Sequence, residues 1–264
     1  MEKSQKLNDN RIKELEEKVL NLTLKLKEKE CELVTVNEAN KLRVSKISHN
    51  LKNPVGVIYS FSDMMLESLE KYTPEKLEKH ITIIKKSAEF SLTLLNAIAK
   101  ITQLQNSTTA FLYKNIDYLP FLNSIIDEFK ETCNEKNIKI IKNFPQAQLM
   151  IYASDDEITI AIYNMLHNAF RYSKDNGTVE IAVIEHENKI ETVIADQGIG
   201  LEPNDLAKVF NEFYVVNTYS EDGQKCLGLG LTIANKIVQF HKGDISISST
   251  FNEGTIIKFK LPKN

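Results

Sequence analysis

A histidine in a polar setting stands at position 49, within SHNLKNP (residues 48–54). Neutral imidazole is a competent nucleophile near pH 7, because its unperturbed pKa is about 6.5. Asn53 lies one helical turn later on the same face. Pro54 brings no N–H to a helix, so the helix can bend there, at a cost of roughly 3 kcal/mol in a helix interior. The cluster alone leaves a solvated face and a nucleophilic site both open.

Two asparagines, Asn164 and Asn168, lie four residues apart in NMLHNAFRY (residues 164–172) and point the same way on a helix. An amide oxygen suits Mg²⁺, which keeps several waters and is held partly by nucleotide phosphates. Arg171 could pair with those phosphates, and Tyr172 could stack on a base. Without further context, the pair indicates no more than the polar stripe of an amphipathic helix.

Two glycine motifs follow. Asp196 ends an apolar run and precedes Gly198 and Gly200, so its carboxylate could accept a hydrogen bond from an exocyclic amine while the glycines let a ligand approach the backbone. An ordinary turn after a strand explains this motif equally well.

Gly228 and Gly230, followed by Leu231, open a helical pattern whose first N–H groups could bind a phosphate. A tight turn is the plainer interpretation. Between the two motifs, residues 209–227 begin with two phenylalanines that could act as anchors and continue as a polar stretch long enough for a mobile lid.

Long helices are predicted to carry the histidine. Residues 8–48 contain no proline or glycine, and their apolar residues alternate in steps of three and four, which favours a parallel dimeric coiled coil over a lone exposed helix. These residues are Ile12, Leu15, Val19, Leu22, Leu26, Leu33 and Val36. After a turn at residues 72–74, capped by Thr73, a second helix is expected over 75–105. Two such hairpins from a dimer would make a four-helix bundle.

The pattern changes after about residue 108. Short β-branched runs at 138–143, 178–185, 189–196 and 255–262 predict strands, and they alternate with helical runs at 117–135, 155–173 and 229–241. The fold class predicted is α+β, with the helical bundle followed by an α/β sandwich. The domains expected are a coiled-coil helix (1–40), a helical hairpin (41–107) and a sandwich domain (108–264).

Composition narrows the class of protein further. The chain has 264 residues and a formal net charge of −3, which argues against nucleic acid as the main partner. Three scattered cysteines form neither a metal site nor a disulfide framework, so a cytoplasmic location fits best. No apolar stretch reaches the ~20 residues of a membrane span. A membrane location is expected only if a sensor region is missing from this chain.

Taken together and in order, the motifs resemble those of the histidine kinase family over about residues 40–262. The segments that carry the resemblance are 49–54 (phosphoacceptor box), 164–172 (asparagine box), 196–200 (first glycine box), 210–214 (phenylalanine box), 228–231 (second glycine box) and 254–257 (third glycine box). Each segment is weak alone, and their shared order makes the resemblance specific.

The resemblance implies a protein-histidine kinase that binds ATP and Mg²⁺ in a Bergerat-type sandwich. His49 would accept the phosphoryl group and pass it to an aspartate on the receiver domain of a response regulator, which the kinase could also dephosphorylate. Asn168 would bind Mg²⁺ with support from Asn164, Arg171 would contact phosphate, and Tyr172 the adenine. Asp196 would bind the adenine amine, and Gly228 and Gly230 would form the hinge of the lid.

The chain departs from the family at Asn50, where the residue after the phosphoacceptor is usually acidic. An asparagine can orient the imidazole but cannot accept its proton at neutral pH. Cys226 and Leu227, before Gly228, make the second glycine box less rich in glycine than usual. Two alternatives stay open: an ATPase related to gyrase, Hsp90 and MutL, and a nucleotide-binding dimeric scaffold.

Overall fold

The protein is described from a computed structural model, in which the chain divides into two units, residues up to Ser91 and residues Leu92–Asn264. The structure describes the backbone of residues 2–67, 70, 72–106, 111–133, 136–216 and 226–264, and the side chains in these ranges from residue 14 onward except 132 and 133.

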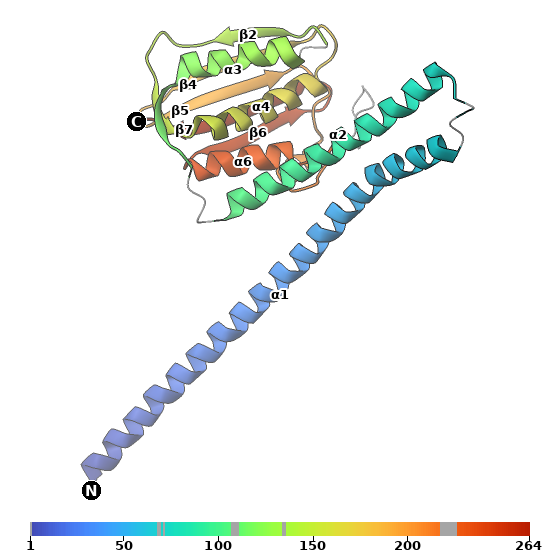
Figure 1. Ribbon diagram of the computed structural model, residues 1–264. Coiled ribbons are helices and arrows are strands. Elements are labelled where there is room, and N and C mark those ends of the chain that lie inside the picture. The colour runs from blue at the N-terminus through green and yellow to red at the C-terminus, as the bar shows by residue number, and fades with distance from the viewer. Residues whose placement is uncertain (1, 68–69, 71, 107–110, 134–135, 217–225) are drawn as a thin grey trace. The chain divides into compact units, whose positions relative to one another are not determined.

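Helices form the first unit (Figure 1). α1 (Glu2–Glu67) continues through Pro54, and α2 (Pro74–Gln105) extends into the second unit. The predicted capping residue is confirmed, because the Thr73 hydroxyl accepts a hydrogen bond from the Lys76 N–H at 3.3 Å. Near this turn the His80 ring of α2 packs edge-on against Phe61 of α1, with ring centroids 4.9 Å apart. The two helices therefore form the expected hairpin.

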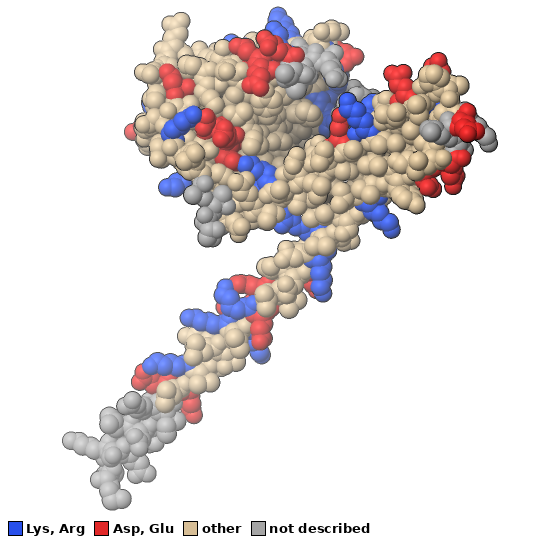
Figure 2. Space-filling model, in the orientation of Figure 1, with Lys and Arg blue, Asp and Glu red and all other residues tan. Residues whose placement is uncertain are grey.

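The apolar seam of α1 is exposed. Figure 2 shows acidic and basic side chains interspersed along the helix. Two ion pairs on the helix are Glu14–Lys18 and Lys29–Glu32. The apolar side chains between them are more than half exposed, namely Leu15, Val19, Leu22, Leu26, Leu33 and Val36. A lone helix has nothing to cover such a seam. Pairing with a second copy stays a prediction.

A five-stranded mixed sheet is the base of the second unit, with the strand order β2-β4-β5-β7-β6. The strands are β2 (Lys139–Asn143), β4 (Thr178–Glu185), β5 (Lys189–Asp196), β6 (Asp244–Thr250) and β7 (Gly254–Pro262). β2 and β4 are parallel, whereas the other neighbours are antiparallel. The register of β5 and β7 places Asp196 opposite Thr255, so two distant motifs meet at one end of the sheet.

Three helices cover one face of this sheet (Figure 1): α3 (Tyr118–Cys133), α4 (Asp155–Tyr172) and α6 (Gly230–Phe240). Their apolar residues recur every three or four positions and are buried; in α4 these are Ile158, Ala161, Ile162, Met165, Leu166, Ala169 and Phe170. A short α5 (Pro203–Leu206) and a two-stranded sheet of β1 (Lys114–Asp117) and β3 (Met150–Ala153) complete the unit. The predicted α/β sandwich is confirmed.

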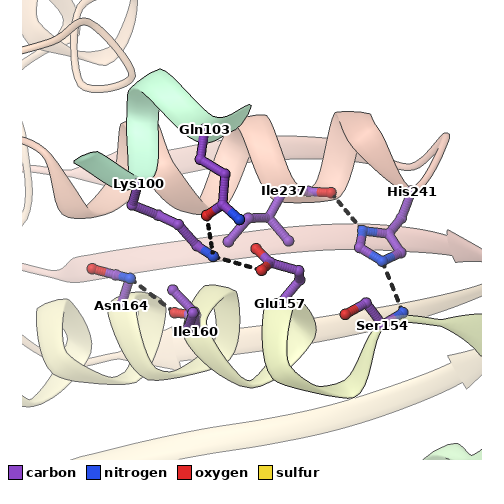
Figure 3. Close-up of polar contacts among 8 residues, drawn as sticks. All are labelled: Lys100, Gln103, Ser154, Glu157, Ile160, Asn164, Ile237 and His241. Atoms are coloured by element: carbon purple, nitrogen blue, oxygen red, sulfur yellow. Dashed lines mark hydrogen bonds and ion pairs between the residues drawn. The ribbon is translucent and has the colours of Figure 1, made fainter. Parts of the chain in front are cut away.

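The end of α2 belongs to the second unit because a buried ion pair ties it to α4 (Figure 3). The Lys100 ammonium lies 2.5 Å from the Glu157 carboxylate, and Glu157 is only 4% exposed. Lys100 also donates a hydrogen bond to the side-chain oxygen of Gln103 at 3.2 Å. The two compact units divide within α2, after residue 91. The domain bounds expected from the sequence, with a boundary after residue 107, stay a prediction.

Replacing Lys100 tests this ion pair. Lys100→Met leaves Glu157 without its cation, and the Oε2 of Glu157 already has no hydrogen-bond partner among the described residues. We expect the free energy of unfolding of the second unit, measured in urea, to fall by about 2–3 kcal/mol, because an unpaired buried carboxylate is costly. The Lys100 side chain is 18% exposed, which keeps the loss below that of a fully buried pair.

The matched control is Lys114→Met, which breaks a more exposed pair with Asp155 of α4 at 2.5 Å within the same unit and should cost about 0.5 kcal/mol or less. Adding Glu157→Met to Lys100→Met should restore much of the stability, since it removes the unpaired charge. If Lys100→Met proves as stable as the control, the ion pair does not hold the end of α2.

Candidate nucleotide-binding site

The two asparagines of α4 both have half-buried side chains. The Asn164 amide donates to the Ile160 carbonyl at 2.8 Å (Figure 3). Its oxygen lies beside Gly230, where an added Cβ would come within 2.8 Å of it. Asn168 lies one turn closer to the end of α4, with no side-chain hydrogen bond to the described residues. Its amide oxygen is therefore free to meet a ligand.

Arg171 and Tyr172, at the end of α4, reach the segment that leads into α6. The Arg171 guanidinium lies 3.7 Å and the Tyr172 hydroxyl 3.6 Å from the Cys226 sulfur. Cys226 is buried, only two residues before Gly228. This contact was not predicted, because Cys226 was notable in the sequence only as a departure from a glycine-rich motif.

Asp196 is buried at the end of β5 and bound by backbone donors from two segments. Its Oδ1 accepts hydrogen bonds from the Gly198 N–H at 2.9 Å and from the Thr255 N–H at 3.2 Å. Burial raises the pKa of the Asp196 carboxyl to about 6, although both backbone donors act in the opposite direction. At neutral pH the site therefore holds a buried carboxylate whose Oδ2 can accept a further hydrogen bond.

The glycines of the first motif are required by close backbone contacts. A Cβ on Gly198 would lie 2.2 Å from the Tyr172 carbonyl oxygen, and one on Gly200 would lie 2.0 Å from the Thr250 carbonyl oxygen. Gly200 also has a φ of 65°, in the region that favours glycine. The Tyr172 carbonyl in turn accepts a hydrogen bond from the Ile199 N–H at 3.2 Å. The turn after β5 is thus locked against the end of α4.

The segment after α5 is bound to the start of α6. The Phe210 carbonyl accepts a hydrogen bond from the Thr232 hydroxyl at 2.9 Å, and the Phe213 N–H donates to the Gly228 carbonyl at 3.0 Å. Gly228 has a φ of 65° and no room for a side chain, since a Cβ would lie 2.3 Å from the Tyr214 carbonyl oxygen. The two phenylalanines are half-buried, as anchors would be. Most of the expected lid, residues 217–225, lies outside the described residues.

α6 begins at Gly230 without a side-chain cap. Its first N–H groups lack intrahelical acceptors and are suited to an anion. Leu231, in the first turn, is half-buried. The N–H groups at this helix start could bind a phosphate, and the unengaged amide oxygen of Asn168 is of a type that can bind Mg²⁺.

The opposite end of α4 is held by a histidine that the sequence left without a role (Figure 3). The Ser154 N–H donates to Nε2 of His241 at 3.1 Å, and Nδ1 of His241 donates to the Ile237 carbonyl at 2.8 Å. Burial lowers the pKa of His241, which keeps the ring in the neutral form that these two bonds require. His241 thus ties the start of α4 to the end of α6.

The predicted phosphoacceptor belongs to the first unit, whereas the residues described above belong to the second. His49 and Asn53 are exposed on α1, Asn50 is half-buried, and Pro54 is buried. The helix runs through Pro54 without a break. An exposed imidazole on a helix face is accessible to solvent and to dissolved reagents.

The second unit has the architecture of an ATP-binding α/β sandwich, and the helical hairpin precedes it. Residues 153–264 match the family model described as "Histidine kinase-, DNA gyrase B-, and HSP90-like ATPase". None of the described helices has both the length and the apolar character of a membrane span.

Relatives and solved structures agree with this architecture. The chain is 30% identical over 221 residues to the sensor histidine kinase WalK of Bacillus subtilis (83% of this chain, 36% of WalK) and 27% identical over 230 residues to the histidine kinase P4 of Formosa agariphila (86% and 17%). It shares its fold with the Acinetobacter baumannii histidine kinase AdeS (TM-score 0.63, 17% identity, 82% of this chain and 98% of that one).

A further match is the histidine kinase ThkA, solved in complex with the response regulator protein TrrA (TM-score 0.69, 21% identity, 84% of this chain and 61% of that one). The chain belongs to the sensor histidine kinases, and it spans about a third or less of the two curated relatives named above.

The raised pKa of Asp196 predicts a particular pH dependence of stability. The unfolded carboxyl titrates near its ordinary value, about 4, and the folded one near 6. Its contribution to stability is therefore fully present below pH 4 and is lost as the pH rises through 6, by about 3 kcal/mol in total. Asp196→Asn stays neutral, so its unfolding free energy relative to wild type should rise by about that amount between pH 4 and pH 7 in urea titrations.

The control is Asp244→Asn, for which the trend should reverse, because the Lys189 ammonium at 2.6 Å holds the pKa of Asp244 below its ordinary value. A pH-independent difference between Asp196→Asn and wild type would contradict the burial of an ionisable carboxyl.

Gly198→Ala should weaken ATP binding at least about tenfold in calorimetry, because backbone atoms at 2.2 Å cannot give way without moving the turn that holds Asp196. Gly56→Ala, where nothing lies within 4 Å of an added Cβ, should leave ATP binding unchanged. Equal affinities for the two variants would mean that the turn after β5 does not contact nucleotide.

Proposed function

We propose that this chain is an ATP-dependent protein-histidine kinase that phosphorylates His49 and transfers the phosphoryl group to an aspartate on the receiver domain of a response regulator. The observation that supports the proposal is that the two sets of functional residues belong to different units. The exposed imidazole belongs to the helical unit, whereas Asp196, the two asparagines of α4 and the start of α6 gather in the α/β unit. The nucleophile and the nucleotide are held by different parts of the chain.

In this proposal, ATP binds between α4, the turn after β5 and the start of α6. The Asp196 carboxylate accepts a hydrogen bond from the adenine amine, beside Gly198 and Gly200. Tyr172 contacts the adenine, and Arg171 contacts a phosphate. Gly228, Gly230 and Leu231 shape the hinge through which the segment before α6 meets the phosphates.

Mg²⁺ would be held by the amide oxygen of Asn168, with Asn164 supporting the metal and the phosphates. Bound there, it would neutralise charge on the phosphates, which dominates catalysis of phosphoryl transfer. Asn164 carries its amide on the α6 side of α4, so a change at Gly230 would reach the metal site through it.

The reaction would proceed by attack of a neutral His49 nitrogen on the γ-phosphoryl group, with ADP as the leaving group and loss of the proton from the other ring nitrogen. An acidic residue at position 50 would accept that proton. Asn50 can orient the ring only, so water takes the proton. We expect forward phosphorylation to be slower than in a kinase with an acidic residue there. Asn53, on the same helix face, would orient a water against a phosphorylated regulator.

Two partners follow from the proposal. The exposed seam of α1 and the helical hairpin favour a homodimer built through a four-helix bundle. A response regulator is the second partner. The matched ThkA structure contains the response regulator protein TrrA, and the shared fold supports an equivalent partner for this chain.

Hydrolysis as the main activity is disfavoured at Asn164. ATPases of the gyrase, Hsp90 and MutL group typically carry a glutamate at this position to activate water, and an amide cannot do so. A nucleotide-binding scaffold without kinase activity is the remaining candidate, favoured only by Asn50.

His49→Ala should abolish acid-labile, base-stable ³²P labelling from ATP, because it removes the nucleophile. ATP affinity should remain within about twofold of wild type, since the nucleotide site lies in the other unit. His186→Ala, a substitution of an exposed histidine in the α/β unit, is the control and should label normally. Wild-type chain that binds ATP but acquires no label would favour the scaffold, and label on His49→Ala would refute the assignment of the phosphoacceptor.

A further inference from the structure

Three consecutive carbonyl groups at the end of α4 receive hydrogen bonds from outside the helix. The Lys136 ammonium donates to the carbonyls of Arg171 at 2.7 Å and Ser173 at 2.8 Å. The carbonyl between them, that of Tyr172, accepts from the Ile199 N–H. Carbonyls at a helix C-terminus have no intrahelical donors, so each needs such a partner.

Lys136 is bound to this helix end from two directions. Besides the two bonds of its ammonium, its own carbonyl accepts a hydrogen bond from the Asn176 N–H at 2.9 Å, in the turn that follows α4. The ammonium also compensates the negative end of the helix dipole. Lys136 precedes β2, so the contact fastens the start of a sheet strand to the end of α4.

The carbonyl of Tyr172 lies between the two carbonyls that Lys136 binds. Tyr172 contacts several parts of the proposed nucleotide site. Its carbonyl meets the turn between Gly198 and Gly200, and that turn supplies one of the two backbone donors of Asp196. Its side chain and that of Arg171 reach Cys226 at the approach to α6. A displacement of these carbonyls would move both the adenine acceptor and the phosphate-side residues.

We propose that Lys136 is a positioning residue for ATP, which holds the end of α4 in register with the turn after β5. It lies outside every motif that suggested nucleotide binding, and it touches no nucleotide itself. The inference rests on the proposed ATP site and adds to it a residue that sets its geometry. A residue that only caps the helix would affect the amount of folded protein, whereas a positioning residue changes the affinity of the folded protein.

Isothermal titration calorimetry with MgATP separates these roles, because it measures the dissociation constant and the number of sites independently. Lys136→Met should raise the dissociation constant about tenfold or more, with close to one site per folded chain, since two charge-assisted bonds are lost. Lys136→Arg should remain within about threefold of wild type, because a guanidinium can donate to both carbonyls. Lys139→Met, an exposed lysine three residues later, should bind like wild type.

If Lys136→Met shows no cooperative unfolding, Lys136→Gln, which keeps a neutral donor, is used in its place. The same tenfold increase in the dissociation constant is then expected. A dissociation constant within twofold of wild type, or a loss of sites at unchanged affinity, overturns the inference for Lys136. Wild-type protein that binds no MgATP overturns the proposed function instead, so the two failures are distinguishable.

Discussion

The candidate site depends on one backbone hydrogen bond, from the Ile199 N–H to the Tyr172 carbonyl. It joins the last residue of α4 to the turn after the central strand β5, and the contact is so close that position 198 has no room for a side chain. On one side of this bond lie the asparagines of α4, and on the other lies Asp196. Moving either element would separate the end of the proposed site at Asp196 from the end at the asparagines.

Much of the remaining structure holds these two elements in place. Lys136 binds the carbonyls of the residues before and after Tyr172. His241 holds the opposite end of α4 against α6. Lys100 adds a third attachment, from α2 to Glu157. A helix held at its start, along its side and at its end is a suitable support for a phosphoryl donor, because phosphoryl transfer is catalysed mainly by positioning and charge.

The parts of the fold that the sequence predicted are those with long local patterns. β4 and β5 have the predicted bounds, since eight residues rich in valine and isoleucine leave little ambiguity. β1 and β3 were missed because four residues are too few to show a period, and β6 because its serines resemble a loop. The motifs drew attention to Asp196 and Asn164 by type and order. Lys136 and Lys100 were not foreseeable, since their roles arise from contacts between residues far apart in the chain, and a lysine gives no local signal. Thr255 lay in the third glycine box, but its bond to Asp196 arises from strand pairing that the motif alone does not reveal.

The pairing of β5 with β7 also bears on how the domain assembles as it is made. Thr255 follows Asp196 by 59 residues, and β7 lies between β5 and β6 in the sheet. At ribosomal rates of about 5–20 residues per second, the chain emerges for roughly 3–12 seconds after Asp196 before Thr255 is synthesised. Until β7 inserts, β6 has no strand to join and the Asp196 carboxylate lacks one of its two donors. The surroundings of Asp196 are therefore among the last features of the domain to form.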